Sequence, residues 1–77
     1  MIFLVAKHSS GLIKIRRGER LTARRFTHAV WARDPRGQIW NGKWQCRVMG
    51  QRAAAQREQR AYADCGFEVE ITPIIAH

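Results

Sequence analysis

The segment between Thr27 and Val48 constrains the fold more than any other part of the chain. It contains all three tryptophans, an Asp-Pro-Arg-Gly tetrapeptide at residues 34–37 and an Asn-Gly dipeptide at residues 41–42. The tetrapeptide is typical of a type I turn, and Asn-Gly is favoured by type I′ hairpins. We therefore predict a β-meander over residues 27–48, although turns this close leave open that one of them is a bulge.

The residues beside these turns alternate as strands require. Trp44, Cys46 and Val48 share one predicted face, and the polar residues between them share the other. Trp44 is therefore expected in the core. Trp31 and Trp40 have two interpretations: exposed beside arginines they would suit base stacking or a protein contact, and buried they would form an ordinary aromatic layer.

Stretches near both ends of the chain also have strand patterns. Residues 2–6 are continuously apolar, which is typical of a central or well-shielded strand, and residues 12–15 alternate weakly, as a returning hairpin strand does. In residues 67–72, apolar side chains alternate with Glu68, Glu70 and Thr72, which predicts a half-buried strand with a polar outer face. Pro73 is expected to end this strand.

Residues 51–64 predict a helix. They are rich in alanine, glutamine, arginine and glutamate, all good helix formers, and Gly66 stands where a C-terminal cap glycine belongs. In a helical projection the side expected to face the sheet is mostly small, with Ala54, Ala61, Tyr62 and Cys65 on it and Ala55 at its edge. Small side chains would let the helix lie close to large residues of the sheet.

The chain length limits the protein to one small domain, residues 1–77. We predict an α+β fold: an antiparallel sheet of four or five strands with a central meander and one helix packed on one face. A core this small is only marginally stable by itself, and dimerisation would bury more surface. The sequence therefore leaves the oligomeric state open between a monomer and a homodimer. The apolar run at residues 2–6 is too short to be a signal peptide or to span a membrane, so we expect a cytoplasmic protein without a membrane partner.

Positive charge is concentrated in the first part of the chain. The formal net charge is +8; residues 1–47 contain eleven Lys and Arg against two acids, whereas residues 48–77 contain three against four. Eleven of the fourteen basic residues are arginine, whose planar guanidinium binds phosphate or carboxylate through two parallel hydrogen bonds. One-sided charge of this kind indicates contact with nucleic acid or with an acidic protein surface.

The densest basic segment runs from Lys14 to Arg25 and contains one acid, Glu19. Its spacing fits neither a helix nor a strand, so we expect a loop or a single helical turn that serves as a binding arm. A mobile, solvated loop is the alternative. The predicted binding residues are the basic side chains of this arm and of the meander, with two tryptophans: Lys14, Arg16, Arg17, Arg20, Arg24, Arg25, Arg33, Arg36, Lys43, Trp31 and Trp40.

No catalytic or metal-binding motif is present. The three histidines and two cysteines lack ligand spacing such as CxxC or HxxxH, so no metal or other cofactor is expected, and the cysteines are expected to be reduced core residues. His28 with Ser9 or Cys46 could in principle form a nucleophile and base, but no spacing favours either pair. We expect a protein that is not an enzyme, with a small ribonuclease toxin as a minor alternative because histidine among arginines can be enough for that chemistry.

The layout of residues 27–73 is a meander, an alanine-rich helix closed by Gly66, and the strand FEVEITP. It resembles the small phage-encoded inhibitors of the anti-CRISPR type. The resemblance implies a non-catalytic protein that docks on a host nucleoprotein complex and blocks nucleic-acid binding. Many such proteins are acidic, so a chain of charge +8 would have to occupy an acidic protein surface or touch the nucleic acid itself. An autonomous nucleic-acid-binding domain is the alternative.

Overall fold

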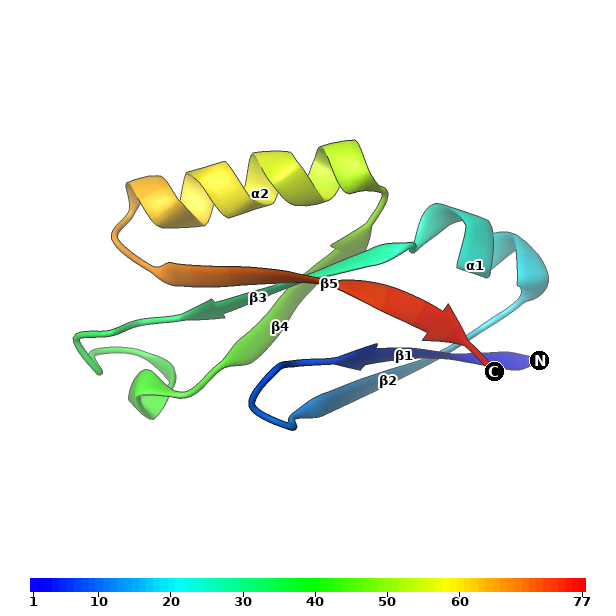
Figure 1. Cartoon of the computed structure of the whole chain (residues 1–77), viewed down its shortest axis with the longest axis horizontal. Helices are drawn as coiled ribbons and strands as arrows, with labels where there is room; N and C mark the ends of the chain where they lie inside the picture. Colours follow the sequence, from blue (N-terminus) through cyan, green and yellow to red (C-terminus); the bar gives the residue numbers. More distant parts are fainter.

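The computed structural model describes residues 1–77 as five strands with two α-helices and one 3-10 turn. The elements, in chain order, are β1 (Ile2–Lys7), β2 (Ile13–Gly18), α1 (Arg20–Arg25), β3 (His28–Arg33), η1 (Trp40–Gly42), β4 (Gln45–Gly50), α2 (Arg52–Asp64) and β5 (Glu68–Ala76). The α+β class, the five-stranded antiparallel sheet and the main helix on one of its faces are confirmed (Figure 1). Neither α-helix combines the length and apolarity needed to cross a membrane.

The strand order is β2-β1-β5-β3-β4, with every neighbouring pair antiparallel. β5 is the middle strand and joins two hairpins: residues 68–73 pair with β3, and residues 74–76 pair with β1. The prediction that Pro73 ends this strand is wrong, because Pro73 lies where β5 passes from one hairpin to the other. β1 is an interior strand, as its apolar run predicted.

The predicted central meander is wrong. β3 and β4 form a single hairpin at one edge of the sheet, and residues 34–44 between them contain no strand. The Asp34 carboxylate, which is 1% exposed, accepts backbone N–H groups from Arg36, Gln38 and Ile39, so the segment folds on itself. Asn41 lies in η1 with a φ of 52° and does not close a two-residue hairpin.

A β-bulge divides the β3–β4 hairpin. Val48 lies opposite Val30, but Cys46 lies opposite Trp31, so Arg47 is an extra residue on β4. An extra residue turns the following side chains to the other face of the sheet. Val48 therefore shares the α2 side of the sheet with Val30, whereas Cys46 joins Trp31 on the opposite side. The prediction that Cys46 and Val48 share a face is wrong for this reason.

The predicted helix and its glycine cap are confirmed. Gly66 has a φ of 88°, and its N–H donates to Ala63 C=O at 2.9 Å while the Phe67 N–H donates to Tyr62 C=O at 3.1 Å. These two bonds form a Schellman motif, completed by contact between the Tyr62 and Phe67 rings, whose centroids are 5.8 Å apart. They satisfy carbonyls at the end of α2 and turn the chain back into β5.

The side of α2 that faces the sheet differs from the projection. Ala55 is completely buried, and Ala54 and Tyr62 are half-buried, but Ala61 and Cys65 are exposed. Tyr62 packs on Phe67 and accepts a hydrogen bond from Arg47 of β4 at 3.3 Å, so its side of α2 lies toward the sheet. Cys65 is therefore not a core residue, whereas Cys46 is half-buried and packs against the core.

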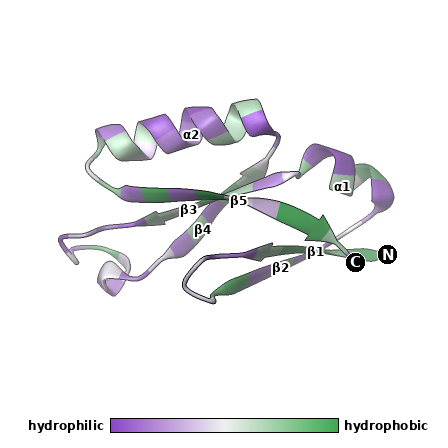
Figure 2. Ribbon diagram, in the orientation of Figure 1, coloured by the Kyte–Doolittle hydropathy of each residue, from purple (hydrophilic) through white to green (hydrophobic).

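The sheet is covered unevenly. On the side away from α2, Ala6, Ala29 and Trp31 form the centre of the core. On the other side α2 lies over β3 and the first part of β5 and leaves β1 and β2 uncovered (Figure 1). Apolar residues of this uncovered area are exposed, including Phe3 at 41%, Ile15 at 58% and Ile75 at 57%. The hydropathy colouring in Figure 2 shows this green area beyond the N-terminal end of α2. The prediction that β1 is shielded on both faces is therefore wrong for the α2 side of the sheet, although β1 is an interior strand.

Candidate binding surface

The predicted basic arm is ordered secondary structure: it is not a loop, and its second part is a short helix, close to the helical turn that was the other prediction. Its first part is the edge strand β2 and its second part is α1. The Glu19 N–H donates to the Thr22 hydroxyl at 3.2 Å at the start of α1. Gly18 permits the tight approach of strand and helix, because a Cβ there would lie 2.9 Å from the Thr22 side chain. The arm is thus a fixed surface at one end of an elongated molecule.

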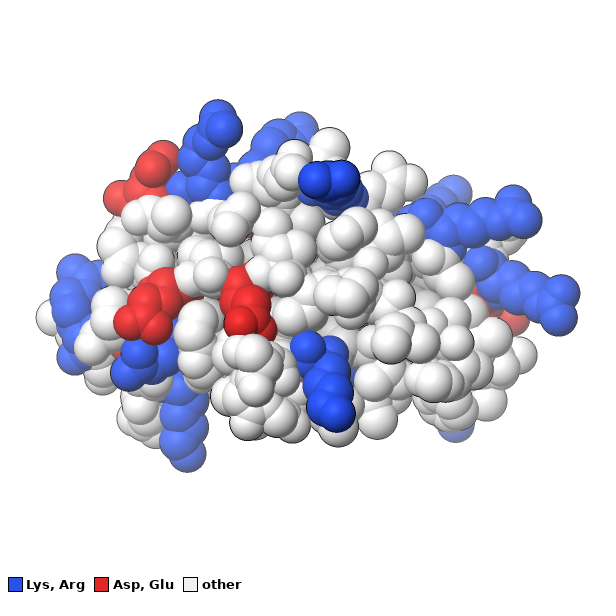
Figure 3. Space-filling model, viewed as in Figure 1, with Lys and Arg blue, Asp and Glu red and all other residues white.

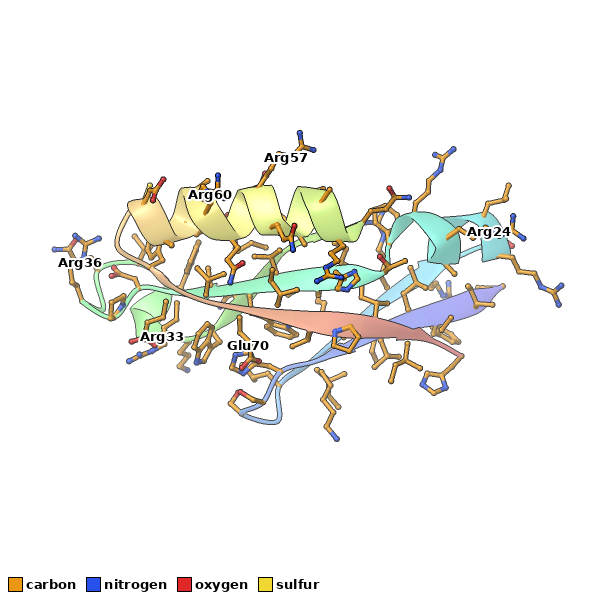
Figure 4. The ribbon with its side chains drawn as sticks, turned by 45° about the horizontal axis from the view of Figure 1, so that its top comes forward. Arg24, Arg33, Arg36, Arg57, Arg60 and Glu70 are labelled. Carbon is orange, nitrogen blue, oxygen red and sulfur yellow. The ribbon has the colours of Figure 1, made fainter.

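The six basic side chains of this arm are all exposed, and none forms an ion pair. Glu19, the acid beside them, lies 3.9 Å from the N-terminal amine. The Arg16 guanidinium lies over the Phe26 ring, 4.5 Å from its centroid, which holds this side chain against the α1 end of the sheet. Figure 3 shows the basic side chains projecting at this end of the molecule, where Figure 4 labels Arg24.

The basic residues of the 34–44 loop region lie at the opposite end and are differently engaged (Figure 4). Arg33 bonds to the Glu68 carboxylate at 3.0 Å and to the Gly42 carbonyl at 2.6 Å, and Arg36 bonds to Asp34 at 3.3 Å. Lys43 is exposed without such a partner. The predicted basic residues therefore do not form one Arg-rich face: six lie on β2 and α1, and Arg33, Arg36 and Lys43 lie at the far end.

All three tryptophans already have ring partners or are buried. Trp31 is 3% exposed and donates its Nε1–H to the Thr72 hydroxyl at 2.9 Å, so its interpretation as an exposed stacking residue is wrong. Trp40 stacks on Phe67 at 5.6 Å, with the Arg47 guanidinium over it at 4.9 Å. Trp44 contacts His8 at 4.3 Å between ring centroids. These contacts correspond to the aromatic-layer alternative.

A groove of about 340 Å³ runs between the two edge strands of the sheet. It is lined by consecutive residues of each strand, 14–16 of β2 and 46–49 of β4, so the strand edges themselves form its walls. An adjoining hollow of about 250 Å³ continues it toward Leu12 and Trp44. Lys14, Arg16 and Arg47 line the groove, and no acidic residue lines either space.

The groove also affects the half-buried thiol at its wall. Burial raises the pKa of Cys46, while the positive charges of Lys14 and Arg47 oppose this rise. The thiol is therefore protonated at neutral pH and behaves as a small apolar wall residue. Positive potential, unpaired strand edges and apolar lining meet in this one place.

A second polar cluster, which the sequence did not reveal, joins the β1–β2 turn to β5. Ser9 donates its N–H and hydroxyl to Glu70 at 3.0 and 2.6 Å, and the buried His8 Nε2 lies 3.1 Å from the same carboxylate. Burial alone would raise the pKa of Glu70, but the bonds from Ser9 and the nearby His8 lower it below its ordinary value. Glu68, two residues earlier on β5, pairs with Arg33, the residue opposite it on β3.

None of the catalytic pairs considered in the sequence is brought together. His28 Nδ1 bonds to the adjacent Thr27 hydroxyl at 2.9 Å, and the Ser9 hydroxyl is bonded to Glu70. The strand registers place His28 and Cys46 on opposite faces of the sheet. No group of three or more His, Cys, Asp or Glu residues is arranged to hold a metal ion.

Comparisons with protein-family models, with curated proteins and with solved structures found no match to this chain.

Proposed function

We propose that this protein is a non-catalytic binding protein that docks through its basic β2–α1 end on an acidic surface of a host nucleoprotein complex and so blocks nucleic-acid binding there. One observation carries the proposal: six exposed basic side chains on one ordered segment have no acidic partner within the molecule. Such side chains steer encounter with an acidic partner. The proposed role is that of a phage-encoded inhibitor of the anti-CRISPR type.

The order of this surface supports a docking role. Side chains on a strand and a helix are held more precisely than those on a mobile loop, so the complex forms at a smaller cost in conformational entropy. The tryptophan rings, by contrast, are buried or already packed on neighbouring rings. This favours recognition by charge over recognition by base stacking.

The experiment compares two charge reversals of equal size. Arg24→Glu with Arg25→Glu changes α1, and Arg57→Glu with Arg60→Glu changes the exposed side of α2 by the same charge. Partners captured from a host lysate treated with nuclease should disappear with the α1 variant and remain with the α2 variant. Equal capture by both variants, at unchanged melting temperature, contradicts the proposal.

The second candidate is an autonomous nucleic-acid-binding domain, favoured by the same free arginines because their planar fork also fits phosphate. It predicts direct binding of a labelled DNA duplex by the purified protein. The α1 reversal should then make the slope of log affinity against log salt shallower, by about 0.9 for each DNA phosphate that the variant no longer neutralises. Weak duplex binding before and after the reversal favours the first proposal.

A further inference from the structure

The sheet of this protein has five strands and two free edges, β2 and β4. Because neighbouring strands are antiparallel throughout, the two edge strands β2 and β4 run in the same direction. They line a common groove but do not pair with each other. One added strand running antiparallel to both would continue the alternation around the sheet.

The free edge of β2 presents backbone groups for such a strand. The His8 N–H donates to the Leu12 carbonyl at 2.8 Å, which makes these two residues a hydrogen-bonded pair of the β1–β2 ladder. In an antiparallel ladder such pairs alternate with pairs whose N–H and C=O groups point away. The register therefore turns residues 14 and 16 toward β1, and Ile13 and Ile15 direct their backbone groups outward.

The side chains beside this edge select the chemistry of the added strand. Lys14 and Arg16 lie on one face of β2, whereas Ile13 and Ile15 lie on the other face and are 57% and 58% exposed. Residues directly opposite each other on neighbouring strands share a face and interact. A matching strand thus carries acids at alternate positions and apolar residues between them. A second copy of β2 would bring like charges together.

We propose that β2 takes up an extended segment of a partner protein, with alternating acidic and apolar residues, as a sixth strand between β2 and β4. This inference rests on the proposed function, since it assumes a protein partner, and adds how that partner is held. The main-chain hydrogen bonds supply affinity, and the charged and apolar side chains supply specificity.

A synthetic peptide of alternating glutamate and valine, capped at both ends and labelled, tests the inference against a matched peptide of alternating lysine and valine. We expect the glutamate peptide to bind, with slower hydrogen exchange at the Ile13 and Ile15 amides, and the lysine peptide not to bind. Failure of the glutamate peptide to bind, equal binding of both peptides, or binding without slower exchange at these amides overturns the inference.

Two variants at one position separate the backbone from the side chain. Ile15→Pro removes an outward N–H, and proline is tolerated at such a position of an edge strand; Ile15→Ala keeps the N–H and shortens the side chain. We expect the proline variant to bind the glutamate peptide about tenfold more weakly than the alanine variant, as the removal of one hydrogen bond implies. Equal binding by the two variants overturns strand addition.

If the proline variant does not fold, the charge-reversal variant with Lys14→Glu and Arg16→Glu tests strand addition in its place. It should abolish binding of the glutamate peptide and permit binding of the lysine peptide; an unchanged preference overturns the inference.

The two proposals can fail separately. If the α1 reversal abolishes capture of the partner but Ile15→Pro does not weaken it, docking by charge stands and strand addition falls. If the α1 reversal has no effect, the proposed function itself fails.

Discussion

β2 and β3 are strands of six residues in one sheet, yet their surroundings differ completely. In β3 the four residues 29–32 are buried, because α2 covers one face and the curled sheet covers the other. In β2 residues 13–17 are all exposed, three of them are basic, and one edge is unpaired. Buried side chains thus lie in the β3 half of the sheet, and the proposed function places binding in the β2 half. If so, changes in one half should leave the property of the other half intact.

The largest expected effect is that of Trp31→Ala, at the centre of the β3 half. The ring is buried and its Nε1–H bonds to Thr72, so the change leaves a cavity and an unpaired hydroxyl. We expect a loss of about 3–5 kcal/mol in the free energy of unfolding, measured by urea denaturation. A loss below about 1 kcal/mol would show that the β3 half is not the stabilising one.

The next effect concerns Asp34, which holds the loop of the same half. Burial alone would raise its pKa, but N–H bonds from Arg36, Ile39 and Gln38, with the Arg36 side chain, lower the pKa below its ordinary value of 3.8. Stability from this carboxylate is therefore fully present above pH 3.8 and is lost as pH falls through the lowered folded-state pKa.

Asp34→Asn should accordingly lower the melting temperature at pH 7, by less than Trp31→Ala does. Below pH 3.8 the gap between the wild type and the variant should narrow, because protonation removes the same negative charge. Thermal melts from neutral to acidic pH measure this gap. A constant gap across the whole range would show that the charge of Asp34 does not stabilise the loop.

A smaller effect is expected for Gly66→Ala at the end of α2. Its φ of 88° is unfavourable for a residue with a Cβ, although no atom lies within 4 Å of the place that a Cβ would take. We expect a loss of about 1–2 kcal/mol from the left-handed backbone alone. Gly11→Ala, with a φ of 99° in the β1–β2 turn, is the matched change in the other half. A loss near zero at Gly66 would mean that the cap relaxes into another geometry.

The smallest effect is expected for Ile15→Ala in the β2 half. The side chain is 58% exposed, so its truncation removes little buried surface. We expect a change of less than about 0.5 kcal/mol in the free energy of unfolding by urea denaturation. A cost as large as that of Gly66→Ala would show that the exposed face of β2 is covered in solution, as in a homodimer.

The features that the sequence predicted correctly depend on neighbouring residues. The α2 cap needs only residues 62–67, and the turn at 34–37 forms as expected, with the Gly37 N–H bonded to the Asp34 carbonyl at 3.1 Å. The errors come from pairings between distant segments and from burial. The sequence around Asp34 fits a simple turn. The buried Asp34 carboxylate, however, also accepts N–H bonds from Gln38 and Ile39, so the expected middle strand does not form.

The candidate site could be predicted only in part for the same reason. The basic residues of the arm were evident, but that β2 is an edge strand facing β4 depends on β5 inserting between β1 and β3. Likewise the pairing of Glu70 with Ser9 and His8 joins residues far apart in the chain. Local patterns contain no information about which strands become neighbours.

The middle position of β5 has a consequence for biosynthesis. This strand leaves the ribosome after the four others, so the inner edges of β1 and β3 have no partner until it arrives. Assembly of the sheet therefore depends on contacts between distant residues, which fold slowly and leave strand edges open to aggregation. A nascent chain that stops before residue 68 would leave the inner edges of β1 and β3 unpaired.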